Sequence, residues 1–450
     1  MVNRFLDALL VPFALKIHLF WQKIKKMLQV AYLREERAKA IAGLQKRNIQ
    51  DADILIDGVI EMDDKRKNTQ TELDALLAEM NNASKSIGAL MQAGKKEEAE
   101  AAKLKTADLK TNSKQLQDEL SEIEQKLQKA LYNIPNIPHA DVKAGKGEDD
   151  NEILSEHGDK PQLHAGKKPH WDLIKDYDII DFELGVKITG AGFPVYKGKG
   201  ARMQRALLNF FLDEAEKVGF KEVQPPIMIN EASGIGTGQL PDKEGQMYHI
   251  QDVDLYMIPT AEVPITNMFR DSILSEGELP IKVTGYTPCF RKEAGSWGAH
   301  VRGLNRLHQF DKVEIVQIQH PDKSYEALEE MSKYIQSLLE KLELPYRVLR
   351  LCGGDLGFTS ALTYDMEVWS AAQEKWLEVS SVSNFETYQA NRLKLRYKDA
   401  DKKKHLLHTL NGSALAFPRI LASILENNQT PEGIKVPKVL QPYTGFDMIN

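Results

Sequence analysis

The feature that most constrains the fold is a pair of apolar stripes with heptad spacing in the first third of the chain. Between Val59 and Leu90, apolar or small side chains recur three and four residues apart, and a second stripe runs from Leu109 to Ala130. A break around Gly94 separates the two stripes. The pattern predicts an antiparallel helical hairpin, with a coiled coil over about residues 57–131. Each arm would project roughly 50 Å, at about 1.5 Å per residue.

The hairpin has two possible roles. Its length suits contact with a large partner, and the simpler alternative is a scaffold or dimerisation element. The apolar pattern stops at Pro135, and residues 136–170 are rich in Gly, Asp, Glu and Lys, which predicts a linker. We therefore predict a helical arm domain over 27–135 and a second domain, with mixed helices and strands, over 171–450.

Residues 1–26 form an atypical N-terminal extension. Its apolar run from Leu6 to Leu15 is interrupted by Pro12 and is too short for a membrane helix, which needs about 20 apolar residues. Neither a membrane span nor a cleavable signal peptide is expected. A charged helical pattern opens at Met27, so we expect translation to begin there.

The composition gives no sign of a globally basic surface, because 65 acidic residues outnumber 59 basic ones. The two cysteines, Cys289 and Cys352, lie in no zinc-ligand spacing, so we expect no disulfide framework, no zinc and a cytoplasmic location. Cys289 is better explained as a small apolar strand residue than as a catalytic thiol. The sequence also contains neither GxGxxG nor GxxxxGK[ST], so side chains must hold any nucleotide phosphates.

The most informative stretch begins at Tyr286 and reads YTPCFRKEAG, followed by RGL and then RLHQFDKVE. Alternating apolar residues on both sides predict two strands joined by a glycine-containing loop. Arg291 could bind a phosphate through two hydrogen bonds, and Glu293 could accept from an adenine amino group or orient that arginine. An ordinary surface hairpin with cross-strand ion pairs would explain these two residues but not the whole pattern.

This stretch resembles motif 2 of class II aminoacyl-tRNA synthetases, and its amino-acid sequence is similar to that of seryl-tRNA synthetases. Other segments that fit the same family are TGQLP at 237–241, MIPTAE at 257–262, EVSS at 378–381 and NGSALAFPR at 411–419. Residues 219–226 resemble motif 1, which implies a homodimer. The resemblance implies an α+β fold in which an antiparallel sheet is flanked by helices and preceded by the helical arm.

The resemblance also implies an activity, its partners and its site residues. ATP would activate L-serine to seryl-adenylate, which would charge the 3′ end of tRNA(Ser) and also tRNA(Sec), with residues 27–135 binding the tRNA. The catalytic pair would be Arg291 and Arg419. ATP would be bound by Arg291, Lys292, Glu293, Leu307, Phe310, Glu378, Val379, Ser380, Ser381 and Arg419. Serine would be bound by Thr260, Ala261, Glu262, Arg291, Glu314, Asn411 and Ser413. Mg²⁺ linked to ATP would be bound by Glu378 and Ser381.

Individual roles carried over from the family are chemically reasonable. Arg291 would hold the α-phosphate and the serine carboxylate, and Glu293 would accept from the adenine amino group. Phe310 would stack on adenine opposite Arg419, which combines aromatic stacking with a cation–π contact. Glu314 would meet the serine ammonium or hydroxyl.

Two other functions remain possible on the same fold. A ligase that charges a carrier protein is expected to lack the long arm that this chain has. A catalytically inactive, synthetase-like binding protein is disfavoured by the retention of Arg291, Glu293, Glu378 and Arg419. One departure from the family pattern is the segment 297–301, which is less basic than usual and leaves contacts to the tRNA acceptor end open.

Overall fold

The computed structural model describes residues 30–293 and 302–450, which fall into two compact units. One unit contains residues 30–41 and Asp51–Ile134, and the other contains Ala42–Gln50 and Pro135–Asn450. Among the described residues, no helix combines the length and the apolar character that crossing a membrane requires. The extension 1–26, the expected start at Met27 and the segment 297–301 lie outside the described residues.

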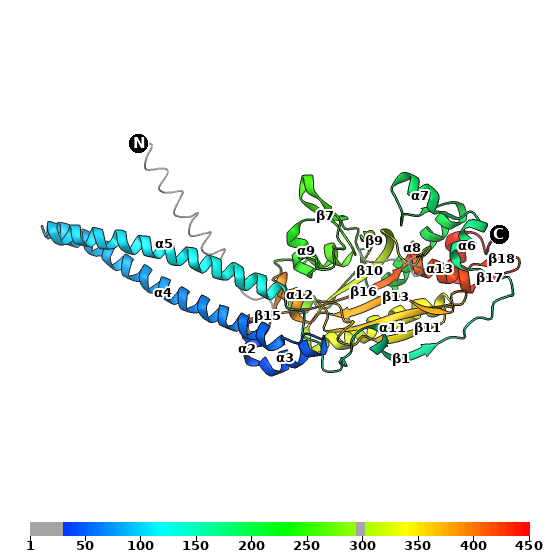
Figure 1. Cartoon of the computed structure of the whole chain (residues 1–450), viewed down its shortest axis with the longest axis horizontal. Helices are drawn as coiled ribbons and strands as arrows, with labels where there is room; N and C mark the ends of the chain where they lie inside the picture. The colour runs from blue at the N-terminus through cyan, green and yellow to red at the C-terminus, as the bar shows by residue number, and fades with distance from the viewer. Residues whose placement is uncertain (1–29, 294–301) are drawn as a thin grey trace. The chain divides into compact units, whose positions relative to one another are not determined.

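The first unit is the predicted helical hairpin. Helix α4 (Ala52–Gln92) runs antiparallel to α5 (Lys96–Tyr132), and α2 (Val30–Glu35) packs on α4 (Figure 1). Helix α3 (Arg37–Lys46) leads from this unit into the second. The apolar stripes face each other, with Leu73 2% exposed on α4 and Leu120, Ile123 and Leu127 buried on α5. Heptad spacing therefore gives the expected pairing, because each stripe is covered only when the two helices pack together.

The stripe of α4 is interrupted by polar residues that are nevertheless buried. Asp63 is 6% exposed and accepts a hydrogen bond of 2.8 Å from Nη2 of Arg66, and Nζ of Lys67 also lies 2.8 Å from it. Thr69 is equally buried. The charge of Asp63 is paired locally, so the helix continues through this interruption without an unsatisfied carboxylate.

The second unit is built on an eight-stranded sheet with the order β1-β11-β12-β13-β16-β10-β9-β4. All neighbouring pairs are antiparallel except β4 and β9. The strands are β1 (Glu152–His157), β4 (Lys221–Glu222), β9 (Ile281–Phe290), β10 (Gln309–Gln319), β11 (Tyr346–Arg350), β12 (Leu362–Ser370), β13 (Lys375–Asn384) and β16 (His408–Ala416). The predicted antiparallel sheet is thereby confirmed.

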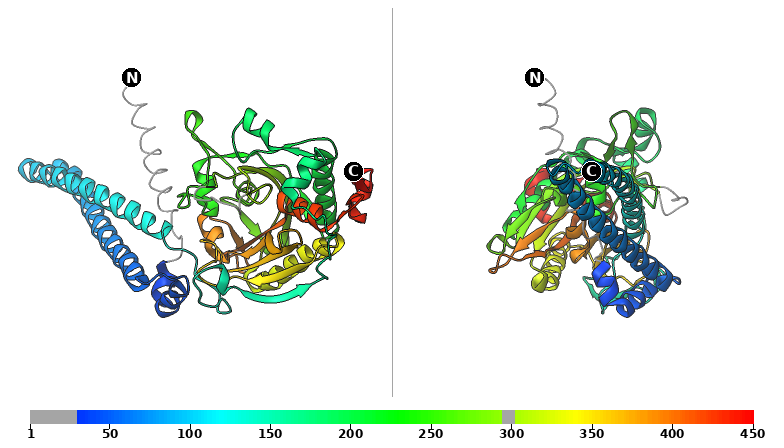
Figure 2. Two further views of the ribbon diagram at one scale, coloured as in Figure 1. Left: turned by 45° about the vertical axis from the view of Figure 1, so that its right-hand side comes forward. Right: turned by 90° about the vertical axis from the view of Figure 1, so that its left-hand side faces the viewer.

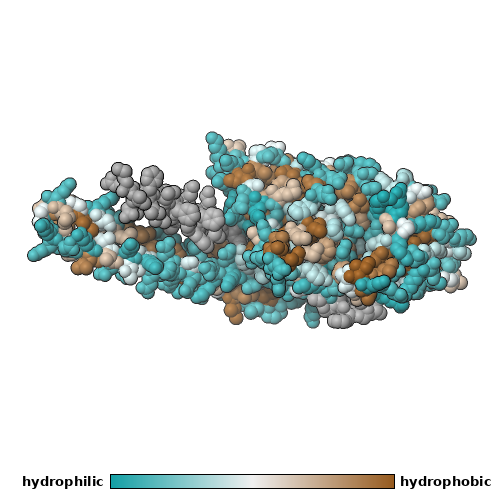
Figure 3. All heavy atoms as spheres, turned by 90° about the horizontal axis from the view of Figure 1, so that it is seen from above, coloured by the Kyte–Doolittle hydropathy of each residue, from teal (hydrophilic) through white to brown (hydrophobic). Residues whose placement is uncertain are grey.

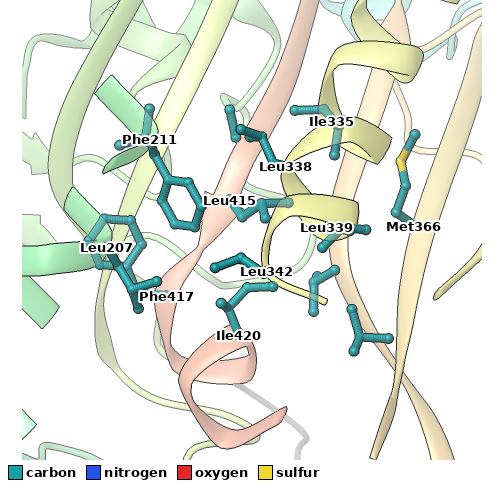
Figure 4. Close-up of a cluster of buried hydrophobic side chains, with 14 of the residues drawn as sticks. Leu207, Phe211, Ile335, Leu338, Leu339, Leu342, Met366, Leu415, Phe417 and Ile420 are labelled. Atoms are coloured by element: carbon teal, nitrogen blue, oxygen red, sulfur yellow. The ribbon is translucent and has the colours of Figure 1, made fainter. Parts of the chain in front are cut away.

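Three helices, α8 (Gly198–Lys217), α11 (Ser324–Lys341) and α13 (Phe417–Asn427), pack against the sheet (Figure 2). Their apolar residues recur at helical spacing, as in Leu207 and Phe211 of α8, so each helix has one apolar face. Figure 4 shows these faces meeting in one core, where Leu338 of α11 and Phe417 of α13 approach Leu415 of β16. This core fixes the strands whose other residues form the site.

Shorter elements complete the second unit. The remaining helices are α6 (His170–Asp176), α7 (Phe182–Ile188), α9 (Glu231–Thr237), α10 (Glu262–Asn267), α12 (Thr387–Arg392) and α14 (Gln441–Thr444). The remaining strands are β2 (Ile180–Asp181), β3 (Val195–Tyr196), β5 (Met228–Ile229), β6 (His249–Ile250), β7 (Leu255–Met257), β8 (Ile273–Ser275), β14 (Arg396–Lys398), β15 (Lys404–Leu406), β17 (Gln429–Thr430), β18 (Gly433–Lys435) and β19 (Met448–Ile449).

The segment 136–170 differs from the linker that its composition predicted. It contributes β1, which pairs antiparallel with β11 at the edge of the sheet. Arg350 of β11 donates a hydrogen bond of 2.5 Å to Glu152 of β1, which compensates a strand with few apolar residues. Backbone pairing with an existing edge therefore orders a segment whose composition alone resembles a loop.

Candidate active site on the central sheet

Arg291 lies where β9 ends and is held by backbone groups on two sides. Its amide donates to the carbonyl of His308 at 3.0 Å, and its Nε donates to the carbonyl of Pro259 at 3.3 Å. The guanidinium carbon lies 5.3 Å from the ring centroid of Phe310 on β10, within cation–π range. Arg291 is thus oriented before any substrate arrives, and it lies over the same ring that was predicted to stack on adenine.

Lys292 and Glu293 follow at the start of the loop between β9 and β10. Lys292 is exposed, whereas Glu293 is partly buried and has a φ of 49°, an uncommon conformation for a residue with a side chain. Oε2 of Glu293 accepts from Nη1 of Arg306 at 3.1 Å across the loop. The pair joins the two legs of the loop, and Leu307 next to it is 2% exposed.

Arg419 lies in the first turn of α13 and faces the other leg of the same loop. Its Nε donates to the carbonyl of Asn305 at 3.0 Å, and its Nη1 donates to the carbonyl of Glu378 on β13 at 2.7 Å. The two arginines predicted to be catalytic are therefore both fixed to the backbone. Of the two, Arg291 lies over the ring of Phe310.

In the segment 378–381 of β13, the two inner residues are buried and the two outer ones are not. Val379 and Ser380 are buried, and the hydroxyl of Ser380 donates to the carbonyl of Ser413 at 2.6 Å. Glu378 is exposed, and the hydroxyl of Ser381 donates to its Oε1 at 3.3 Å. Glu378 and Ser381 are consequently available to a ligand, while the side chains of Val379 and Ser380 hold the strand in place.

The donor set around Glu378 fits a hard cation such as Mg²⁺, which prefers oxygen ligands. Asp365, opposite Ser381 on β12, is 8% exposed, and its Oδ1 has no hydrogen-bond partner within the described residues. Burial and the charge of Glu378 raise the pKa of Asp365 well above its usual value. The described residues contain no cluster of three or more His, Cys, Asp or Glu side chains arranged to hold a metal.

The predicted serine-binding residues gather around Glu314, which is fully buried on β10. Its Oε2 accepts from Oγ1 of Thr260 at 3.0 Å and lies 2.5 Å from Nζ of Lys312, and its Oε1 accepts from Nδ2 of Asn411 at 2.9 Å. Ser413 is the residue opposite Glu314 in the ladder between β10 and β16. The structure thus brings residues from three segments into one small polar cluster, which we name the serine pocket.

Glu262 forms a second carboxylate in this pocket at the start of α10, directly after the buried Ala261. It is 6% exposed and accepts a hydrogen bond of 2.6 Å from Nε2 of Gln389. Burial, and then the neighbouring charge of Glu314, raise the pKa of Glu262 to about 7. The pocket therefore holds two buried carboxylates near one ammonium, Lys312, and is suited to a ligand that brings a second cation.

Sequence reasoning missed two side chains of this pocket. Lys312 stands two residues before Glu314 on the same strand, so period-two alternation could have placed both on one face. Gln389 comes from α12, about 130 residues beyond Glu262, and no local pattern marks it. It is 0% exposed and also accepts from Oγ1 of Thr409 at 2.7 Å, which fixes its amide orientation.

Two protein-family models and several known proteins match this chain. The "Seryl-tRNA synthetase N-terminal domain" model matches residues 27–138, and the "tRNA synthetase class II core domain (G, H, P, S and T)" model matches 248–428. The chain is 50% identical to the serine–tRNA ligase of Salinibacter ruber over 94% of this chain and 99% of that protein. It is 45% identical to that of Akkermansia muciniphila, with the same coverage.

A solved structure gives the same assignment. The seryl-tRNA synthetase of Pyrococcus horikoshii complexed with ATP matches with a TM-score of 0.87 at 34% identity, covering 94% of this chain and 99% of that one. Sequence identity, coverage and fold therefore indicate the same family, and both the N-terminal and the C-terminal part of the chain match a domain model. The chain belongs to the seryl-tRNA synthetase family of class II aminoacyl-tRNA synthetases.

Proposed function

We propose that the side chains gathered at the ends of β9, β10 and β13 carry out the family's reaction in this chain. That reaction is the ATP-dependent activation of serine followed by transfer of serine to tRNA. The observation that carries the assignment is the pair of backbone-fixed arginines, Arg291 and Arg419, next to the buried pocket around Glu314. One site can then hold a nucleotide phosphate beside a small polar amino acid.

The first step needs positioning and charge stabilisation rather than proton transfer. The serine carboxylate is already an anion, and its oxygen attacks the α-phosphorus in line while the bond to pyrophosphate breaks. Arg291 holds the reacting carboxylate and phosphate, and Arg419 neutralises charge on the phosphates. Glu293 accepts from the adenine amino group through Oε1, while its Oε2 keeps the hydrogen bond from Arg306. The tRNA 3′-terminal hydroxyl then attacks the adenylate, and AMP leaves.

Serine fits the pocket because its groups match the donors and acceptors present. The ammonium adds a second cation beside Lys312 for the two carboxylates Glu262 and Glu314, and the hydroxyl can exchange hydrogen bonds with Thr260 or Asn411. A site built to bond a hydroxyl discriminates against an analogue without it by roughly 10⁴ to 10⁵. Alanine is therefore a poor substrate.

Amino-acid-dependent ATP–pyrophosphate exchange, measured with each of the twenty amino acids, tests this assignment. Serine should give the highest rate, with alanine lower by roughly 10⁴ because buried polar groups around Glu314 would be left unpaired. Faster exchange with another amino acid would overturn the specificity. Exchange with serine followed by transfer to a carrier protein instead of tRNA would favour the alternative ligase.

Glu378 and Ser381 would hold the ATP-linked Mg²⁺, and Asp365, the buried residue opposite Ser381 in the sheet, adds a further carboxylate next to them. When bound, the ion withdraws charge from the phosphates. Glu378 supplies the exposed carboxylate and keeps its backbone carbonyl for Arg419. Glu378→Gln should weaken the binding of Mn²⁺ to the protein–ATP complex in electron paramagnetic resonance titrations, and unchanged binding would remove Glu378 from the ligand set.

The pH dependence of stability tests the environment of Glu262. Its folded-state pKa is raised, so below about pH 4.5 its contribution to stability is fully present, and this contribution is lost as pH rises through about 7. Glu262→Gln keeps the acceptor for Gln389 without the charge. The Tm of the wild type should fall relative to that of the variant by roughly 2–5 °C between pH 5.5 and 8. Serine should raise the wild-type Tm more than the variant Tm at pH 8.

Differential scanning fluorimetry of both proteins across this pH range gives the measurement. Parallel Tm profiles would mean that Glu262 titrates in its ordinary range and that the pocket is better solvated than its burial indicates. The comparison with the isosteric variant removes the contribution of other groups that titrate in the same window, such as histidines.

The partners proposed for the chain are tRNA(Ser), tRNA(Sec) and a second copy of the chain. The face of the hairpin that Figure 3 shows is mostly hydrophilic, which suits an RNA partner better than an apolar protein surface. A hollow lined by Val223, Pro225 and Pro226, with Met228 and Met268 about half exposed, supports a homodimer through the motif 1 segment. Sedimentation of the full chain as a monomer would exclude that dimer.

A cytoplasmic location suits the two free cysteines, and cell fractionation tests it.

A further inference from the structure

A buried polar cluster behind the loop leg that leads into β10 has no part in the reaction as described so far. It centres on His170, the first residue of α6, and Glu426, near the end of α13, and both side chains are 0% exposed. Nδ1 of His170 lies 2.6 Å from Oε1 of Glu426, and Nε2 of His170 lies 2.8 Å from the amide nitrogen of Leu304. The cluster therefore connects two helices to the loop.

The hydrogen bonds define the tautomer of His170. A backbone amide can only donate, so Nε2 must be the unprotonated nitrogen that accepts from Leu304. Nδ1 then carries the proton and donates to Glu426. Burial raises the pKa of Glu426, but the bonds from His170 and Ser370 outweigh it and leave that pKa below its usual value. The hydrogen bonds alone therefore assign the neutral, Nδ1-protonated imidazole to His170.

The loop approaches His170 more closely than a side chain would allow. A Cβ on Gly303, whose φ is 66°, would lie 2.3 Å from Nε2 of His170. The guanidinium carbon of Arg302 lies 4.9 Å from the ring centroid of Trp171, the next residue of α6. Three consecutive loop residues, 302–304, are thus fitted to the first turn of α6.

The residues that follow connect this docking point to the proposed ATP site. The carbonyl of Asn305 accepts from Nε of Arg419, and Arg306 donates to Glu293. A second path runs through Gln373, whose Nε2 donates to Oε1 of Glu426 at 2.9 Å and whose Oε1 accepts from Nδ2 of Asn305 at 3.2 Å. Arg419 and Glu426 are both on α13, so the contacts form a closed ring around the loop leg.

We propose that His170 is a positioning residue for ATP, which fixes the loop leg 302–306 through its neutral imidazole and thereby places Arg419 and Glu293 around the nucleotide. The inference rests on the ATP-site roles proposed above. A buried amide N–H without an acceptor costs free energy. Without His170 the amide of Leu304 would lose its acceptor, so residues 302–306 would move away from α6. The serine pocket is built on other segments and does not depend on this bond.

Two substitutions separate the roles of the ring nitrogens. His170→Asn keeps a donor near Nδ1 for Glu426 but loses the acceptor for Leu304, whereas His170→Gln extends an acceptor toward the position of Nε2. We expect the KM for ATP in pyrophosphate exchange to rise about tenfold in His170→Asn and to stay within about threefold in His170→Gln. The KM for serine should change less than about twofold in both. His157→Asn, at an exposed histidine of β1, is the matched control.

A purely structural role for His170 predicts a different result. Partial unfolding would lower the active fraction, and hence kcat, while leaving both KM values unchanged. Equal kinetics of the two His170 variants, or an unchanged KM for ATP in His170→Asn, would overturn the inference. Gly303→Ala, which displaces the loop without altering His170, should also raise the KM for ATP and provides an independent test if the histidine variants do not fold.

The same assay distinguishes failure of this inference from failure of the proposed site. Normal pyrophosphate exchange in Arg419→Ala would contradict the proposed ATP site itself. Loss of exchange in Arg419→Ala together with a normal KM for ATP in His170→Asn would contradict only the role of His170 and leave the proposed ATP site in place.

Discussion

Replacing Arg291 with alanine is expected to lower serine-dependent ATP–pyrophosphate exchange by about 10²-fold or more, the scale for losing one preorganised donor in an active site. The side chain is already oriented by the carbonyl of Pro259 and by the ring of Phe310, so little reorganisation is needed when substrate binds. The measurement is exchange under saturating ATP and serine, which reports the chemical step, together with the KM for each substrate.

Two controls make this result specific to Arg291. Arg205→Ala removes an exposed arginine from α8 and should leave exchange near the wild-type rate. Arg291→Lys keeps the positive charge but not the planar fork, so it should recover only a small part of the lost activity. Near-normal exchange in Arg291→Ala would contradict its role in the reaction, whatever the outcome for other residues.

The motif-bearing strands could be predicted from the sequence because their function is encoded locally. Arg291, Glu293 and Glu314 stand in one stretch whose alternation defines two strands; Arg291 and Glu293 follow directly after β9, and Glu314 lies on β10, which pairs with β9. Cys289 also follows its strand environment, since it is fully buried and burial raises its pKa. For these positions, the pattern of residue types in the neighbouring sequence was sufficient to predict the local structure.

The contacts made across the fold could not be predicted in the same way. Gln389 reaches Glu262 from α12, and His170 reaches Leu304 from α6, so each contact depends on how distant elements pack. The same applies to β1, whose charged sequence gives no strand signal and which pairs only because β11 offers an open edge. Local patterns indicate the candidate reacting groups, while the side chains that hold those groups in place are brought together only by the tertiary structure.

Shortening the helical arm is expected to separate the two half-reactions. The ion pairs Lys65–Glu119 and Lys105–Glu79 show which residues of α4 and α5 lie side by side. In that register residue 69 lies opposite residue 115, so deletion of residues 69–115 shortens both helices to the same point. A short Gly/Ser linker can then rejoin the helices. Serine-dependent ATP–pyrophosphate exchange should remain within about threefold of wild type, because the proposed site lies in the second compact unit.

Charging of tRNA should fall by at least roughly 100-fold in the same variant, which corresponds to about 3 kcal/mol of lost binding. Helices with alternating acidic and basic residues read an RNA helix through its shape, phosphates and 2′-hydroxyls, and each such contact is weak alone. Retained exchange shows that the shortened chain is folded and active, so loss of charging can be assigned to the arm. Charging at the wild-type rate would instead mean that the hairpin is a scaffold and that recognition of the tRNA lies elsewhere in the chain.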